Sequence, residues 1–193
     1  MHALPSIVNL ALPEWIYREV DATKIYADDE ARVALAIWLA RRNVEEKTGG
    51  PFGAAVFTRA GKLISAGVNR VVAQNCSVAH AEMMAYMLAQ SKLHRFRLND
   101  PALGEPSGEF VLATSAQPCC QCYGATMWAG IDELLIGARS ADVEELTEFD
   151  EGPLPADWVG ELERRGVRVK RDILRAQARD VFLRYRELGG ASY

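Results

Sequence analysis

Two short motifs, far apart in the sequence, constrain the fold of this chain more than any other feature. The first is His80–Glu82, "HAE", and the second is Pro118–Cys122, "PCCQC"; each opens a segment with helical character. Because Cys119 and Cys122 are three positions apart, they lie on the same face of a helix and can bind one ion. A fold that uses both motifs has to bring two helix ends together.

The crowded thiols are open at first to four interpretations: a disulfide framework, a redox pair, a metal site or chance. The close spacing and an expected cytoplasmic location disfavour disulfides. A redox pair explains neither His80 nor Glu82. One neutral histidine and two thiolates give zinc three protein ligands and leave a fourth position open, as in catalytic sites. A structural zinc site with an incidental glutamate is the alternative, with Cys76 as the candidate fourth ligand.

Glu82 gives this metal site a catalytic interpretation. Zinc lowers the pKa of its bound water to about 7, and a carboxylate beside it can take that proton and later deliver it to a ring nitrogen and a leaving amine. Positions two apart diverge in a continuous helix, so His80 and Glu82 converge only if the helix end points at the metal. We expect Cys120 to point elsewhere and to be packed.

Composition and charge narrow the class of protein. The chain has 193 residues, of which 49% are hydrophobic and 25% charged, as expected for one globular domain. A formal charge of −4 argues against a protein built mainly to hold nucleic acid. We find no Lys/Arg-rich leader and no apolar run near the ~18 residues of a membrane span, so we predict a cytoplasmic protein with no membrane partner.

Alternating helix and strand patterns predict an α/β layered sheet. We expect one domain over 1–193, with an N-terminal extension over 1–27 and a C-terminal helical segment over 154–193 that could cap the active site. Helices are predicted over about 28–47, 79–92 and 119–129, and strands over 52–58, 63–69, 109–114 and 134–138, the first two as a hairpin. An acidic loop, a short helix near Trp158, a short strand near 167–169 and a final helix to about Leu188 follow.

From about Asp29 to Pro153 the chain resembles the cytidine-deaminase-like superfamily of zinc nucleobase deaminases. The resemblance is carried by "GGPFGAAVF", "AGVNRVV", "CSVAHAEMMA", "TSAQPCCQCYGATMWAG", "ARSADVE" and "FDEGP". It is strongest to the bacterial guanine deaminase branch, whose members include some that accept the triazine ammeline. It implies a three-layer α/β/α sandwich with a five-stranded mixed sheet, both ligand helices on one face, and a homodimer. One zinc ion per subunit would be bound by His80, Cys119 and Cys122, with Glu82 as the proton shuttle.

The same resemblance implies a set of residues around the substrate. Glu151 would assist the leaving amine, and the base would be contacted by Asn69, Phe52, Ala81, Trp128 and Tyr193. Five of these also have an ordinary structural interpretation: a turn cap for Asn69, core packing for Phe52 and Trp128, a frayed terminus for Tyr193 and a solvated loop residue for Glu151. Gln117 departs from the family, which commonly has Glu at this position.

The resulting prediction is hydrolytic deamination of a free nucleobase, with guanine giving xanthine and ammonia in purine catabolism. A triazine such as ammeline, or cytosine, is the alternative within the same chemistry. A tRNA adenosine deaminase is a further alternative, because residues 164–186 hold nine Lys/Arg and only two Asp. We expect no nucleic-acid partner and interpret this segment as a solvated helix face. A non-catalytic zinc-stabilised binding protein is the alternative from another class.

Overall fold

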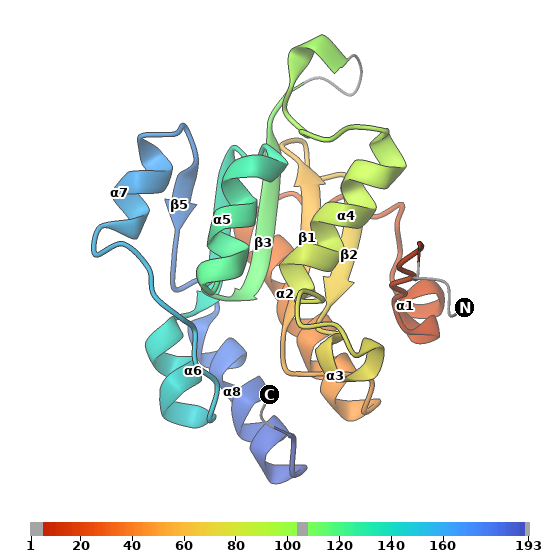
Figure 1. Ribbon diagram of the computed structural model, residues 1–193, viewed down its shortest axis with the longest axis vertical. Coiled ribbons are helices and arrows are strands. Elements are labelled where there is room, and N and C mark those ends of the chain that lie inside the picture. Colours follow the sequence, from red (N-terminus) through yellow and green to blue (C-terminus); the bar gives the residue numbers. More distant parts are fainter. Residues whose placement is uncertain (1–5, 104–107, 192–193) are drawn as a thin grey trace.

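Five strands form one mixed sheet between two layers of helices (Figure 1). The structure, a computed structural model, describes residues 6–103 and 108–191. The elements are α1 (Glu14–Glu19), α2 (Asp29–Glu45), β1 (Gly53–Thr58), β2 (Leu63–Val68), α3 (Val71–Gln74), α4 (Ala81–Leu93), η1 (Pro101–Leu103), β3 (Phe110–Ala116), α5 (Cys120–Ala129), β4 (Glu133–Ala138), α6 (Ser140–Leu146), α7 (Trp158–Glu163), β5 (Arg168–Lys170) and α8 (Arg175–Glu187). Their order in the sheet is β2-β1-β3-β4-β5. The predicted mixed sheet is confirmed.

The direction of the strands divides the sheet into two parts. β1 is antiparallel to both of its neighbours, β2 and β3, whereas β4 is parallel to both β3 and β5. Helices α4 and α5 lie on one face, and α2 and α8 lie on the other (Figure 1). The predicted three layers are therefore present. In the parts of the chain that the structure describes, every helix is too short or too polar to traverse a lipid bilayer.

Three helices were not predicted: α1, α3 and α6. The acidic loop expected after β4 is wrong for residues 140–146, which form α6. The carboxylate of Asp142 accepts a hydrogen bond of 2.8 Å from the backbone N–H of Arg139, which stabilises the first turn of this helix. Val143 and Leu146 then bury its apolar side. The acidic composition concealed a short amphipathic helix.

Alternating residues of the strands contribute to two separate hydrophobic cores, one on each face of the sheet. In β1, Ala55 and Phe57 belong to the core under α2 and α8, whereas Ala54 and Val56 belong to the core under α4 and α5. This period of two follows from the pleat of a strand. Because the strands are apolar on both faces, the sheet is covered on both sides, as its helical layers require.

Gly67 allows β2 to approach the first turn of α4 very closely. A Cβ atom on Gly67 would lie 2.1 Å from the carbonyl oxygen of Ala81 and 2.6 Å from the backbone nitrogen of Ala85. Any side chain at this position would therefore push the helix away from the sheet. The contact fixes the start of α4, and with it the position of His80.

The C-terminal segment 154–193 contributes to the sheet and to the layer behind it. β5 adds an edge strand parallel to β4, and α8 packs beside α2. In the segment 1–27, the helix α1 buries Trp15 and Ile16. The described parts of both terminal segments thus pack against the hydrophobic core on the α2 side of the sheet.

Asp142 ties α8 to α6. Its side chain is 1% exposed and accepts two hydrogen bonds of 2.7 Å from Arg175 and a further one from Arg179. The hydrogen bonds from Arg175, together with those from the Arg139 N–H and Arg179, hold the pKa of the Asp142 carboxyl well below its usual range. This buried carboxylate is the main polar link between the two helices.

We predict that Asp142→Asn lowers the free energy of unfolding by about 2 kcal/mol at pH 7, because it removes charge-assisted hydrogen bonds. A carboxyl whose pKa is depressed on folding stabilises the fold fully above its ordinary pKa near 4, and this stabilisation is lost as the pH falls towards the folded-state pKa. The difference between wild type and variant should therefore shrink below about pH 4. Urea unfolding over a pH series measures it.

Glu145→Gln is the matched control. Glu145 contacts the same Arg179 at 3.1 Å, but its side chain is 63% exposed. Exposed ion pairs contribute little, so this variant should stay within about 0.5 kcal/mol of wild type at every pH. Equal losses in the two variants, or a pH-independent loss in Asp142→Asn, would contradict the prediction.

Candidate active site

Two helices begin at the same edge of the sheet because of the strand directions. β2 and β3 are both antiparallel to β1, so they run parallel to each other and end at one edge. The α4 helix begins after β2 and the short α3, and α5 begins directly after β3. The carboxyl ends of parallel strands are where α/β folds bind ligands. The topology thus brings together the "HAE" and "PCCQC" motifs.

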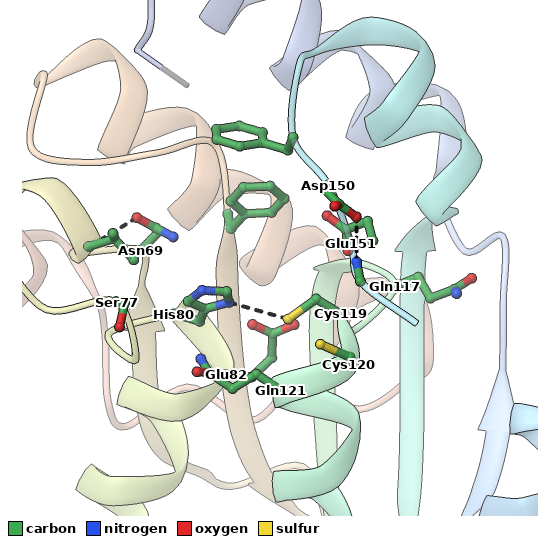
Figure 2. Close-up of a pocket in the computed structure, with 14 residues that line it drawn as sticks. Asn69, Ser77, His80, Glu82, Gln117, Cys119, Cys120, Gln121, Asp150 and Glu151 are labelled. Atoms are coloured by element: carbon green, nitrogen blue, oxygen red, sulfur yellow. Dashed lines mark hydrogen bonds between the residues drawn. The ribbon is translucent and has the colours of Figure 1, made fainter. Parts of the chain in front are cut away.

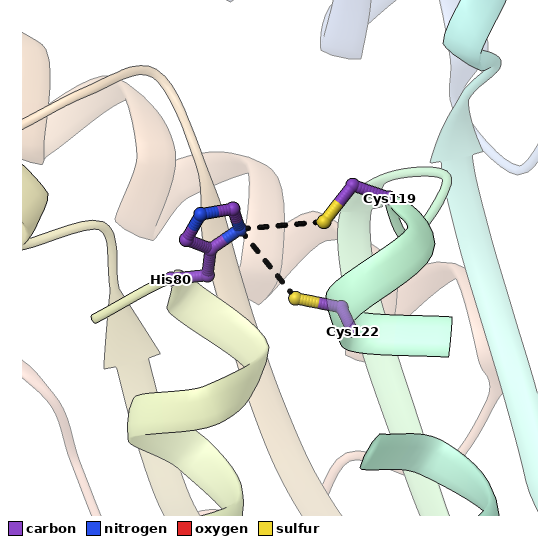
Figure 3. Close-up of side chains that lie close together, drawn as sticks. All are labelled: His80, Cys119 and Cys122. Carbon is purple, nitrogen blue, oxygen red and sulfur yellow. Dashed lines mark hydrogen bonds between the residues drawn. The ribbon is translucent and has the colours of Figure 1, made fainter. Parts of the chain in front are cut away.

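His80, Cys119 and Cys122 converge at this edge (Figure 3). The Nδ1 atom of His80 lies 3.4 Å from the sulfur of Cys119 and 3.6 Å from that of Cys122. The three ligand atoms all lie within 4.8 Å of one another. Figure 3 shows both sulfurs pointing at the same ring nitrogen, so the three groups face one common point.

The geometry of the two helix starts explains how the ligands converge. His80 is the N-cap of α4 and has an extended backbone, with φ −69° and ψ 160°. Cys119 is the N-cap of α5 and is also extended, so the helix begins at Cys120, one residue later than predicted. Neither N-cap side chain makes a capping hydrogen bond. Because His80 precedes the helix, it does not diverge from Glu82 as two helical residues would. The predicted condition, a helix end that points at the metal, is met.

The two thiols are electronically unlike. The hydrogen bond from the Cys122 thiol, reinforced by His80, lowers the pKa of Cys119 to about 4. The hydrogen bond to the Cys119 thiolate, followed by burial, raises the pKa of Cys122. Cys119 is therefore a thiolate at neutral pH, and Cys122 carries the proton that metal binding would release.

The Glu82 carboxylate lies against the ligand set. Its Oε1 accepts a hydrogen bond of 3.2 Å from the hydroxyl of Thr114, and its Oε2 lies 3.3 Å from the sulfur of Cys122. Burial, followed by the charge of Cys119, raises the pKa of Glu82. A carboxyl with a raised pKa is suited to both accepting and donating a proton.

The donor set fits a divalent zinc ion. Two cysteine sulfurs and one imidazole nitrogen are ligands that zinc prefers, and one of the thiols is already deprotonated. The candidate fourth ligand, Cys76, does not join them: among the residues described, the ligand cluster comprises His80, Cys119 and Cys122. Cys76 packs against the hydrophobic core instead. This favours the catalytic over the structural type of zinc site.

A cavity of about 450 Å³ adjoins the ligand set (Figure 2). That volume is in the usual range for small-molecule pockets. Six of the predicted site residues line it: Phe52, Asn69, His80, Glu82, Cys119 and Glu151. Burial, followed by the charges of Cys119 and Glu82, raises the pKa of Glu151 to about 8. Gln117 also lines the cavity, so the residue that departs from the family pattern lies at the site.

Asn69 caps a turn and also lines the cavity. Its Oδ1 accepts a hydrogen bond of 3.2 Å from the backbone N–H of Val71, as a turn-capping asparagine does. The residue is 1% exposed and still lines the cavity. In Figure 2 its amide nitrogen is turned away from the turn, so the group left for a ligand is a hydrogen-bond donor.

An aromatic cluster forms one wall of the cavity. The rings of Phe52 and Phe149, which both line it, have centroids 5.4 Å apart. Behind them, two residues of α8 complete the cluster: Phe182 lies 5.8 Å from Phe52, and Tyr185 stacks on Phe149 at 6.0 Å. None of the described residues of 154–193 lines the cavity itself. The C-terminal segment therefore supports the wall from behind.

Two predicted substrate contacts are placed elsewhere, and a third lies outside the described residues. The side chain of Ala81 is buried in the core under α4 and is not part of the cavity lining. Trp128 lies near the end of α5 with 78% of its surface exposed, outside the cavity of this chain. Tyr193 lies outside the described residues. Helical position explains Trp128, because six residues along α5 carry the chain away from the helix end that holds the ligands.

Sequence reasoning missed several residues of the cavity. Phe149 and Gly152 flank the acidic pair Asp150 and Glu151, and Cys120 is exposed at the cavity rather than packed as expected. The aromatic-acidic stretch "FDEG" could have pointed to Phe149. No pattern in the sequence could have placed Cys120 beside Gly152, because that contact exists only in the folded chain.

Comparisons with known proteins agree with this site. Residues 27–138 match the family model of the cytidine and deoxycytidylate deaminase zinc-binding region. The chain therefore belongs to this family of zinc-binding deaminases.

Individual relatives divide between two substrate classes. A guanine deaminase of Bacillus subtilis is 36% identical over 110 residues, which span 57% of this chain and 64% of that protein. A tRNA-specific adenosine deaminase of Buchnera aphidicola is 30% identical over 131 residues, which span 68% of this chain and 76% of that protein. Among solved structures, a guanine deaminase from Nitrosomonas europaea superimposes with a TM-score of 0.87 at 40% identity, covering 96% of this chain and 100% of that one.

We predict that the chain binds one zinc ion and that Cys119→Ala and Cys122→Ala each abolish stoichiometric binding, since each removes one of three ligands. Cys76→Ala and Cys120→Ala are matched controls, because neither thiol belongs to the ligand cluster. Zinc content after dialysis, measured by atomic emission, distinguishes them. Loss of zinc in the Cys76 variant would instead identify Cys76 as a fourth ligand, as in a structural zinc site.

Proposed function

We propose that this protein is a zinc-dependent aminohydrolase that converts guanine and water into xanthine and ammonia. The observation that carries the proposal is the position of Glu82, with its buried carboxylate against three convergent zinc ligands and open to a cavity of nucleobase size. The similarity to guanine deaminases of Bacillus subtilis and Nitrosomonas europaea supports guanine as the base.

The zinc ion would be held by His80, Cys119 and Cys122. When bound, it acts as a Lewis acid and lowers the pKa of water. Glu82 would take one proton from the water that attacks the amino-bearing carbon and would deliver it to a ring nitrogen of the base. The second proton of the same water would go to the amino group, so that a carbon–oxygen bond replaces the carbon–nitrogen bond that breaks. The Thr114 hydrogen bond holds the carboxylate in place through these transfers. One water is consumed, and one ammonia leaves.

The base would be oriented by Phe52 and Asn69. Phe52 lines the cavity, and its ring offers a stacking surface for a planar heterocycle. Since Oδ1 of Asn69 is used by Val71, its amide N–H group is free to donate to a carbonyl oxygen or an unprotonated ring nitrogen. Guanine presents both kinds of acceptor. Glu151, whose carboxyl lies in the same cavity, would accept from the departing amine.

The basic C-terminal segment argues against a tRNA substrate. Seven of its nine Lys/Arg residues form ion pairs within the chain: Arg164, Arg165, Arg168, Lys170, Arg175, Arg179 and Arg184. Of the other two, Arg171 lies over the ring of Trp158. Paired cations contribute less to phosphate binding than free ones, because an existing ion pair must be broken first. This supports the interpretation as a solvated helix face.

We also propose the homodimer that the resemblance implies. Two large apolar side chains are exposed near the ends of α4 and α5: Phe96 at 75% and Trp128 at 78%. Exposed aromatic residues of this kind are typical of protein interfaces. A partner subunit that covers them would account for the position of Trp128.

Substrate preference is the direct test of the proposed function. We expect the zinc-loaded protein to release ammonia from guanine at a kcat/KM at least tenfold above that for ammeline, cytosine, adenine and cytidine, a ratio within the reach of pocket contacts. Ammonia is measured with a coupled assay, and tRNA binding is measured in parallel at low and high salt. Inactivity on every free base, together with salt-sensitive tRNA binding, would overturn the proposal in favour of a tRNA deaminase.

Glu82→Gln tests the mechanism. The amide keeps the shape of the carboxyl but cannot carry a proton, so we expect kcat to fall by about 10²–10⁴-fold with zinc content and thermal midpoint unchanged. Glu163→Gln, at an exposed site on α7, is the control and should retain full activity. Turnover that survives in Glu82→Gln would exclude this proton shuttle.

A further inference from the structure

We propose that Cys120 and Gly152 are positioning residues, and that their contact holds the Glu151 carboxyl in the cavity. Cys120 belongs to the first turn of the ligand helix α5, and Gly152 follows Glu151 in the loop after α6. The inference rests on the proposed function, because that function gives the Glu151 carboxyl its catalytic role. It assigns a role to Cys120, which does not belong to the ligand cluster.

A backbone hydrogen bond joins the helix to the loop. The N–H of Cys120 donates to the carbonyl oxygen of Glu151 at 3.0 Å. The first N–H groups of a helix have no partner within the helix, so they are available to groups from elsewhere in the fold. Here the Glu151 loop supplies the acceptor. The residue that carries the carboxyl is thus fixed directly to the helix that carries Cys119 and Cys122.

Gly152 gives the loop its direction. Its φ is +67°, a left-handed conformation that glycine adopts without strain. The turn is closed by Asp150, whose Oδ1 accepts a hydrogen bond of 2.8 Å from the N–H of Gly152. A Cβ atom at position 152 would lie 2.6 Å from the sulfur of Cys120 and 3.3 Å from its Cβ. The thiol therefore occupies the space that a side chain at position 152 would need.

Glu151 is consequently held from both sides. Ahead of it, Phe149 is fixed in the aromatic wall against Phe52 and Tyr185. Behind it, the Glu151 carbonyl is hydrogen-bonded to the Cys120 N–H, and the Cys120 sulfur fills the space beside Gly152. Between these two anchors the Glu151 side chain is only 7% exposed and lines the cavity. A displacement of about 1 Å in a catalytic group can lower the rate about 10²-fold, so this contact can control activity without touching substrate.

Gly152→Ala is the principal test. We expect kcat to fall by about 10- to 100-fold with KM and zinc content nearly unchanged, because the added methyl displaces the loop and the carboxyl with it. Gly166→Ala is the matched control: Gly166 also has a positive φ, +84°, but nothing lies within 4 Å of an added Cβ. It carries the same backbone strain without the contact, and it should keep wild-type kcat.

A second variant approaches the contact from the helix. Cys120→Leu enlarges the side chain at an exposed position and leaves the backbone of Gly152 unaltered, so it should be tolerated by the fold. We expect it to lower kcat as Gly152→Ala does. If Gly152→Ala fails to fold, this variant decides the question alone.

The effect must pass through Glu151, and a double-variant cycle shows whether it does. In a Glu151→Gln background, Gly152→Ala and Cys120→Leu should lower kcat by less than about twofold. Full additivity, or a Gly152→Ala variant that matches Gly166→Ala, would overturn the inference even with Glu151 essential. Wild-type turnover in Glu151→Gln alone would show that Glu151 has no catalytic role, and the inference would then fail with it. The proposed guanine deaminase activity is tested separately, by the substrate comparison.

Discussion

The convergence of two helix starts on one histidine nitrogen is the interaction on which the rest of the site depends. It follows from strand direction: β2 and β3 are parallel to each other because each is antiparallel to β1, so the helices after them begin at one edge. Gly67 then fixes the height of α4 against the sheet. With this arrangement, three ligands separated by up to 42 positions face one point.

The helix starts are specialised for function at a cost to local stability. An N-cap is normally Ser, Thr, Asp or Asn, and losing such a cap costs about 1 kcal/mol. Here His80 and Cys119 occupy both N-cap positions and make no capping hydrogen bond, which leaves their side chains available to a metal. The backbone N–H of Cys120 is satisfied instead by the Glu151 loop. The same bond thus satisfies the helix end and fixes the backbone of Glu151, whose side chain lines the cavity.

The C-terminal segment acts on the cavity from the opposite face of the sheet. Asp142 fastens α8 to α6, and α8 presents Phe182 and Tyr185 to the two phenylalanines of the cavity wall. Seven of its nine cations form ion pairs, several of which link this segment to the sheet and to α6. A segment that suggested nucleic-acid binding by its charge is therefore a structural support of the pocket.

The candidate ligand set and most of the fold could be predicted from the sequence, because both rest on local patterns. Helical spacing of Cys119 and Cys122, apolar strands and the hairpin at 52–69 are all short-range features. The α6 helix escaped prediction because an acidic stretch with few apolar residues is typical of a loop; only the folded chain shows Val143 and Leu146 buried and Asp142 paired with Arg175. Likewise, the exposure of Trp128, the position of Asn69 at the cavity and the closeness of Cys120 to Gly152 depend on the packing of the whole fold. They join residues that are brought together only by the packing of the sheet and its helices, and no local periodicity encodes such contacts.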